Sequence, residues 1–116
     1  MTCIMNETDL HVAVVKYIRD HHPYAILVAG LGEYQNTEEL RLECWRKGYT
    51  KGQPDQMICN PNQQYVGFAI EFKSPTGLGE LSLAQKRYLA RLRKQGWKTL
   101  VSNCLVEVAI ELSKYF

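Results

Sequence analysis

The sequence of 116 residues is long enough for one domain and leaves little room for a second. About 46% of the residues are hydrophobic and 22% are charged, which is the ordinary composition of a globular protein. The net charge of +2 neither indicates nor excludes a nucleic-acid partner, so the placement of the charges matters more than their sum. We therefore expect a single domain over residues 1–116, with a core that forms without disulfides.

The cysteines are Cys3, Cys44, Cys59 and Cys104. Their spacing fits neither a metal site nor a disulfide framework. Reduced, mostly buried thiols in an intracellular protein are expected. The first residues lack a basic segment followed by an apolar run, as a signal peptide would have. The longest apolar stretch is far short of the ~20 residues that cross a bilayer. The sequence thus predicts a soluble protein of cytoplasmic type.

In the first half of the chain, Asn6 is placed to cap a helix that Pro23 ends. Residues 25–29 (AILVA) predict a short buried strand, followed by a loop. Residues 37–47 predict a second helix, which Gly48 stops. Helices and strands therefore alternate from the beginning.

In the second half, strands are predicted at residues 55–59 and 65–73, with a turn at residues 60–64 between them. A helix at residues 82–95, a strand at 98–102 and a final helix at 105–115 follow. A loop with Gly77 and Gly79 precedes the helix at 82–95. The strands on either side of the turn form an antiparallel hairpin. The whole order is αβαββαβα, which favours a three-layer α/β fold with a mixed sheet and helices on both faces.

The longer strand of the hairpin brings a carboxylate and an ammonium group together. Because side chains alternate along a strand, Glu71 and Lys73 share one face, beyond the small residues Gly67 and Ala69. Folding the hairpin back through its turn puts Asp55 opposite Ile70 and Glu71. The other face carries the expected core residues Val66, Phe68, Ile70 and Phe72.

Two neighbouring carboxylates repel each other unless a cation lies between them. Oxygen ligands of this kind suit Mg²⁺ or Mn²⁺, and a metal so held can activate water and neutralise charge on a phosphodiester. Lys73 is suited to orient or deprotonate the attacking water, or to stabilise the charged transition state. The simpler alternative is a surface ion pair between Glu71 and Lys73, which is common in strands.

Three motifs together distinguish these alternatives: residues 48–55 (GYTKGQPD), residues 70–73 (IEFK) and residues 81–85 (LSLAQ). In this combination the sequence resembles the VRR-NUC family, a branch of the PD-(D/E)xK nucleases, nearly from end to end. The resemblance implies a restriction-endonuclease-like fold and a metal bound by Glu7, Asp55, Glu71 and the Phe72 carbonyl. It further implies that Lys73 is the catalytic lysine and that Gln85 is the helix glutamine near the site. The loop at residues 29–33 departs from the family, since many members have an Asn-Gly pair there.

Two of these residues are unusual for their positions without reference to the family. Glu7 lies on the same helical face as the apolar stripe formed by Leu10, Val14 and Ile18, where an unpaired charge is costly. A helix-start carboxylate that faces solvent is the alternative. Gln85 lies among apolar residues of its helix, so its amide needs partners, either at the site or on nearby backbone.

Basic residues are concentrated in two places. The helix at 82–95 carries Lys86, Arg87, Arg91, Arg93 and Lys94, a local charge suited to DNA phosphates, although a solvated charged face is an equal alternative. Lys47 and Lys51 belong to the glycine loop beside Asp55, where they are better placed to contact a phosphate near the expected metal. Lys47, Lys51, Lys86, Arg87 and Arg91 are therefore the candidate DNA-binding residues.

The function favoured by the sequence is a Mg²⁺- or Mn²⁺-dependent DNA endonuclease. By resemblance to free-standing family members, such as those of viruses and phages, it would be a homodimer that cuts branched DNA such as a Holliday junction. A non-catalytic DNA-binding or adaptor module with the same fold is an alternative, although all four residues Glu7, Asp55, Glu71 and Lys73 are present. An RNA-directed nuclease is another, because phosphate-centred sites do not inspect the 2′-hydroxyl.

Overall fold

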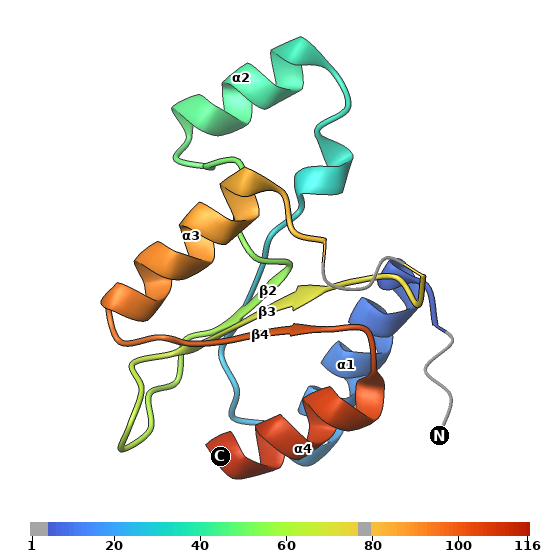
Figure 1. Ribbon diagram of the computed structural model, residues 1–116, viewed down its shortest axis with the longest axis vertical. Helices are drawn as coiled ribbons and strands as arrows, with labels where there is room; N and C mark the ends of the chain where they lie inside the picture. The colour runs from blue at the N-terminus through green and yellow to red at the C-terminus, as the bar shows by residue number, and fades with distance from the viewer. Residues whose placement is uncertain (1–4, 77–79) are drawn as a thin grey trace.

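The computed structural model describes residues 5–76 and 80–116, and it has the element order expected from the sequence (Figure 1). One short 3-10 helix, η1, is added in the predicted loop after the first strand. The elements are α1 (Glu7–His21), β1 (Leu27–Ala29), η1 (Gly32–Tyr34), α2 (Glu38–Arg46), β2 (Gln56–Ile58), β3 (Phe68–Phe72), α3 (Leu83–Lys94), β4 (Lys98–Ser102) and α4 (Leu105–Tyr115). The predicted loop at Gly77 and Gly79 lies outside the described residues, as does Cys3.

The four strands form one mixed sheet in the order β1-β2-β3-β4. The first three strands pair antiparallel, and the register of the hairpin places Gln56 opposite Ile70. The last pair is parallel, with Glu71 opposite Val101, because α3 returns the chain to the same end of the sheet. Strand β3 is thus central and carries the residues of the E-x-K motif at its carboxyl end.

Helices cover both faces of the sheet, as the predicted three-layer fold requires (Figure 1). Helices α1 and α4 pack together on one face, while α3 lies on the other. The main core lies under α1 and α4, and its fully buried members are Leu10, Val14, Ile18, Ile58, Phe68, Ile70, Phe72, Val108, Leu112 and Tyr115. All five residues of β3 are buried, as is usual for a strand with helices on both sides.

The starts of α1, α2 and α3 follow from capping side chains. The Asn6 side chain accepts a hydrogen bond from the Asp9 amide at 2.8 Å, as the sequence predicted. Thr37 caps α2 in the same way, and Ser82 caps α3 with a reciprocal bond from Gln85. The predicted helix and strand at residues 98–115 agree with the structure at every boundary.

Two sequence expectations about burial are wrong. Residues 25–29 do not form a buried strand, because β1 is the edge of the sheet and its Val28 side chain is 46% exposed. Val66 does not join the core face of the hairpin, because β3 begins only at Phe68, and Val66 is 51% exposed.

The expectation of reduced, mostly buried cysteines holds for the redox state of Cys44 and Cys59, but it is wrong about burial and about Cys104. Cys44 is half-buried and Cys59 is exposed, because Cys59 follows the end of β2 beyond the core. Both are free thiols, but Cys104, at the cap of α4, takes part in a disulfide bond. Within the described ranges, no helix has the length and apolar character needed to cross a membrane.

Candidate active site

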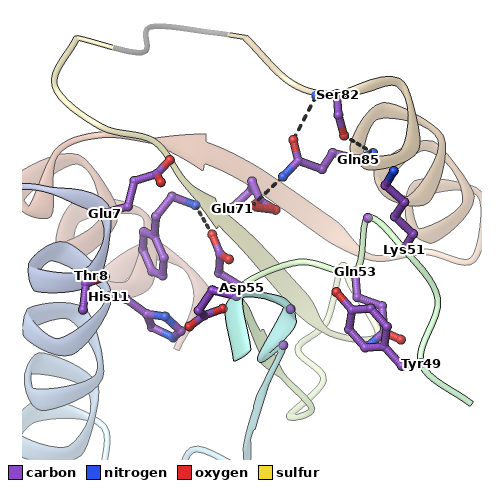
Figure 2. Close-up of a pocket in the computed structure, with 15 residues that line it drawn as sticks. Glu7, Thr8, His11, Tyr49, Lys51, Gln53, Asp55, Glu71, Ser82 and Gln85 are labelled. Carbon is purple, nitrogen blue, oxygen red and sulfur yellow. Dashed lines mark hydrogen bonds between the residues drawn. The ribbon is translucent and has the colours of Figure 1, made fainter. Parts of the chain in front are cut away.

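A pocket of about 300 Å³ opens at the carboxyl end of β3 (Figure 2). Its walls come from the start of α1, from η1, from the loop before β2 and from the start of α3. Four carboxylates line it, those of Glu7, Glu33, Asp55 and Glu71. Since so many acidic groups share one small volume, the pocket has a strong preference for positive charge.

Asp55 lies one residue before β2, so the hairpin register sets it level with Glu71. Its Oδ2 atom accepts a hydrogen bond from the Phe72 amide at 2.8 Å, and its carbonyl accepts one from the Gly30 amide at 2.9 Å. The side chain is therefore oriented by backbone groups on both sides.

Glu71 is the most constrained charged group of the site. Its side chain is only 3% exposed, and its Oε1 accepts a hydrogen bond from Gln85 Nε2 at 3.2 Å. Its Oε2 is buried and has no hydrogen-bond partner within residues 5–76 and 80–116. The neighbouring carboxyl of Asp55 can share a hydrogen bond with Glu71 only when one of the two is protonated.

Burial raises the pKa of Glu71 to about 9, and the hydrogen bond and negative charge of Asp55 add to the effect. The ammonium group of Lys73 acts in the opposite direction. A pKa this high favours a shared proton between the two carboxyl groups at neutral pH when no cation lies beside them.

Lys73 is linked to Glu71 by hydrogen bonds through the side chain of Gln85. Lys73 Nζ donates to Gln85 Oε1 at 3.2 Å, and the same oxygen accepts from the Ser82 amide at 2.9 Å. The Gln85 amide therefore has both kinds of partner expected from the sequence, the backbone amide of Ser82 and the site residue Glu71. Lys73 does not line the pocket itself and meets the carboxylates through Gln85.

Glu7 lies at the first position of α1 and lines the opposite side of the pocket (Figure 2). It is exposed, unlike the buried stripe of the same helix, because α1 begins beyond the edge of the core. Among the residues that the structure describes, no three or more His, Cys, Asp or Glu side chains are grouped to hold a metal ion. The pair of Asp55 and Glu71 thus forms the centre of the site, and Glu7 faces it from across the pocket.

The candidate DNA-binding residues are dispersed. Lys51 lines the pocket, whereas Lys47 points away and pairs with Glu43 on α2 at 3.0 Å. The α3 residues Lys86, Arg87 and Arg91 are exposed, and none of them forms an ion pair with another described residue. They leave an unpaired positive surface on the helix whose first turn contributes to the pocket.

Two side chains of the pocket wall, His11 and Tyr49, are not among the site residues predicted from the sequence. His11 donates or accepts a 2.9 Å hydrogen bond with the buried Gln56 and lies against the Phe72 ring. Tyr49 is half-buried, and its pKa is raised by burial and then by the charges of Glu71, Asp55 and Glu33. The position of Tyr49 inside the glycine motif could have indicated a place at the site, but the motif does not specify which side chain stands at that position.

A mixed sheet covered by helices, with Asp55, Glu71 and Lys73 at the end of its central hairpin, defines a nuclease-type α/β domain of the PD-(D/E)xK kind. The VRR-NUC domain matches residues 5–109, and the chain belongs to this family. Nucleases of the family generally depend on a divalent metal.

Solved structures share the fold at low sequence identity. One described as "VRR_NUC domain protein" has a TM-score of 0.76 and 20% identity, over 96% of this chain and 88% of its own. Another, described as "VRR_NUC domain", has a TM-score of 0.61 and 16% identity over the full length of both chains. No curated protein matches the chain. These structures establish the fold, and the site must be argued from its own residues.

The buried carboxyl pair predicts an unusual dependence of stability on pH. The folded protein keeps on Glu71 a proton that the unfolded chain loses above its ordinary pKa of 4.5, so stability should fall as pH rises from about 4.5 toward 9. Glu71→Gln should raise the thermal melting midpoint of the metal-free protein at pH 8 and flatten this dependence. Melting curves in chelator from pH 5 to 9 measure both effects.

Glu39→Gln, on the exposed surface of α2, is the matched control, and it should leave the pH profile unchanged. A Glu71→Gln profile parallel to that of the wild type would contradict the assignment.

Proposed function

We propose that this chain is a Mg²⁺- or Mn²⁺-dependent endonuclease that hydrolyses phosphodiester bonds in DNA. The observation that carries the proposal is the buried Glu71 carboxyl beside that of Asp55, since no donor among the described residues reaches its Oε2 atom. Such an arrangement destabilises a folded protein at neutral pH unless a proton or a cation compensates for it. A divalent cation is the natural partner, since the pocket that surrounds the pair is acidic throughout.

The residues present fit a small, hard cation. Mg²⁺ keeps several waters and needs only one or two protein carboxylates, so Asp55 and Glu71 suffice without a third grouped ligand. Glu7 and the Phe72 carbonyl are proposed as further contacts, direct or through water. When bound, the cation would neutralise charge on the phosphodiester and favour deprotonation of a nearby water.

The role proposed for Lys73 is to hold the attacking water and offset the charge that develops on the phosphate. Gln85 is the positioning residue, because its amide bridges Lys73 to Glu71 and its own backbone is fixed by the Ser82 cap. The Gln85 amide thereby fixes the distance between Lys73 and Glu71, which do not form a direct ion pair.

DNA is the proposed substrate, and a branched form such as a Holliday junction is proposed by the resemblance to free-standing family members. Lys51 supports it from inside the pocket, and the free cations Lys86, Arg87 and Arg91 support it from α3. Contacts of this kind fix a backbone in place without reading its sequence. Lys47 is proposed as an outer contact once it leaves its exposed ion pair with Glu43, which is weakly held.

Cleavage assays test the proposal directly. End-labelled four-way junction, flap, duplex and single-stranded RNA substrates are incubated with Mg²⁺, with Mn²⁺ or with chelator. The expected result is metal-dependent cleavage of junction DNA. Binding without cleavage in every metal would favour the non-catalytic module, and cleavage confined to RNA would favour the RNA-directed nuclease.

Two alanine variants should separate metal binding from chemistry. Asp55→Ala should abolish both cleavage and Mn²⁺ binding while the fold is kept, because removing one carboxylate relieves the repulsion. Lys73→Ala should keep Mn²⁺ binding and lose most of the single-turnover rate. Titration calorimetry with Mn²⁺ and single-turnover cleavage of junction DNA measure the two quantities separately. An active Asp55→Ala protein, or a Lys73→Ala protein that loses metal but not rate, would refute these roles.

The basic face of α3 should supply affinity that depends on salt. Arg87→Glu combined with Arg91→Glu should weaken junction binding and lower the slope of log K against log salt by up to about 2, since each phosphate contact contributes about 0.9. Fluorescence anisotropy in chelator gives the slope. The matched control is Arg19→Glu with Lys114→Glu, on the helices that cover the other face of the sheet. Equal slopes in wild type and the α3 variant would show that this helix faces away from DNA.

A homodimer is proposed, because two sites are needed to cut two strands and a domain of this size gains from an added interface. Exposed apolar side chains support it: α2 has no buried residue, and its Leu42 and Trp45 are 49% and 67% exposed. Light scattering at micromolar concentration should give twice the mass of 13.4 kDa. A stable monomer that cuts both strands of a junction symmetrically would be incompatible with this assembly.

A further inference from the structure

Tyr49 is fixed in place by the way in which α2 ends. The Gly48 amide donates to the Trp45 carbonyl, and the Tyr49 amide donates to the Cys44 carbonyl at 2.9 Å. These two bonds form a Schellman motif, and Gly48 supplies the positive φ, of +101°, that the motif requires. The backbone of Tyr49 is therefore set by the helix end before its side chain makes any contact.

The Tyr49 ring then extends to the pocket wall, where its hydroxyl meets η1 (Figure 2). A Cβ added at Gly32 would lie 2.5 Å from the hydroxyl oxygen, so the glycine makes room for it. The side chain is half-buried, yet its hydroxyl has no hydrogen-bond partner among the residues that the structure describes. A positioned donor on a pocket wall that no described residue engages is available to a ligand.

The charges of the pocket indicate what that ligand is. A phosphodiester must approach four carboxylates, so it needs donors in addition to a cation. The Gln85 amide is already engaged with Glu71, and the His11 ring is engaged with Gln56. Among the described residues that line the pocket, the side chains with a donor still free for a phosphate oxygen are Lys51, Tyr49, Thr8, Ser82 and Gln53. Tyr49 differs from the others because the end of α2 fixes its backbone. The Tyr49 phenol is protonated at neutral pH, as any phenol with an ordinary or raised pKa is.

We propose that the Tyr49 hydroxyl donates a hydrogen bond to a non-bridging oxygen of the scissile phosphodiester. The inference rests on the proposed nuclease function and adds to it a substrate-contacting residue from the glycine loop. As an uncharged donor, Tyr49 stabilises the phosphate without competing with the cation for Asp55 and Glu71. It holds the phosphate from the η1 side of the pocket, across from Glu7.

The decisive variant is Tyr49→Phe, which removes the hydroxyl and keeps the ring. Single-turnover cleavage of junction DNA in Mn²⁺ should slow by about 10- to 100-fold, the usual effect of losing a hydrogen bond to a charged group. The melting midpoint and the Mn²⁺ affinity, by calorimetry, should match those of the wild type. Tyr34→Phe is the matched control, because Tyr34 lies on η1 but does not line this pocket, and it should cleave at the wild-type rate.

A sulfur-substituted substrate identifies the contact itself. Replacing one non-bridging oxygen of the scissile phosphate by sulfur weakens a hydrogen bond to that atom. In one of the two stereoisomers the sulfur replaces the oxygen that Tyr49 contacts, so this isomer should slow the wild type more than it slows Tyr49→Phe. Any effect of sulfur on metal affinity should be equal in the two proteins, so it does not alter the comparison. An unchanged rate in Tyr49→Phe, or equal sulfur effects in both proteins with both isomers, would overturn the inference. If the wild type cleaves no substrate at all, the nuclease proposal fails as well, so the two failures are distinguishable.

Discussion

The structure of the site depends on one unfavourable interaction, the approach of the Asp55 and Glu71 carboxyls in a nearly dry environment. Burial raises the pKa of Glu71, and Asp55 raises it further, so the pair is neutralised by a proton in the absence of any other cation. The hairpin register enforces this approach, because Asp55 and Glu71 are neighbours across β2 and β3. The Phe72 amide then orients Asp55, and the Gln85 amide orients Glu71. Each carboxyl of the pair is thus held in place by an amide donor.

Holding the pair requires unusually close packing between loops, and glycine provides it at two positions. A Cβ at Gly30 would come within 2.2 Å of the Pro54 carbonyl oxygen, just before Asp55. A Cβ at Gly52 would come within 2.4 Å of the Ala84 carbonyl oxygen, and Gly52 also has a φ of +94°. The first contact ties the loop after β1 to Asp55, and the second ties the loop before it to the start of α3. The glycines thereby keep Asp55 and Gln85 in register with Glu71.

Much of this was predictable, because local rules dominate in the second half of the chain. Alternation along the hairpin placed Asp55 beside Glu71, and the ranges predicted for the last strand and the last helix match those of β4 and α4. The errors arose where position in the sheet decides the outcome. Nothing in residues 25–29 reveals that β1 is an edge strand, and nothing in the apolar stripe of α1 reveals that Glu7 lies beyond the core. The indirect contact of Lys73 through Gln85 depends on the approach of α3 to β3, which no local pattern contains.

Negative charge gathers inside the pocket, whereas exposed positive charge lies outside it on α3. Among the described residues that line the pocket there are four carboxylates and one lysine, Lys51, so the interior favours a cation and disfavours a bare phosphate. Outside it, α3 carries unpaired cations that attract a polyanion over a distance of about a Debye length. The same helix begins with Ser82 and Gln85 at the pocket, so it links the attractive surface to the acidic interior. A nucleic acid drawn to α3 would therefore reach a site that accepts its phosphate only after the cation has entered. Under the proposed function, binding and cleavage would therefore depend on different residues, and the exposed charges of α3 could vary without disturbing the buried pair.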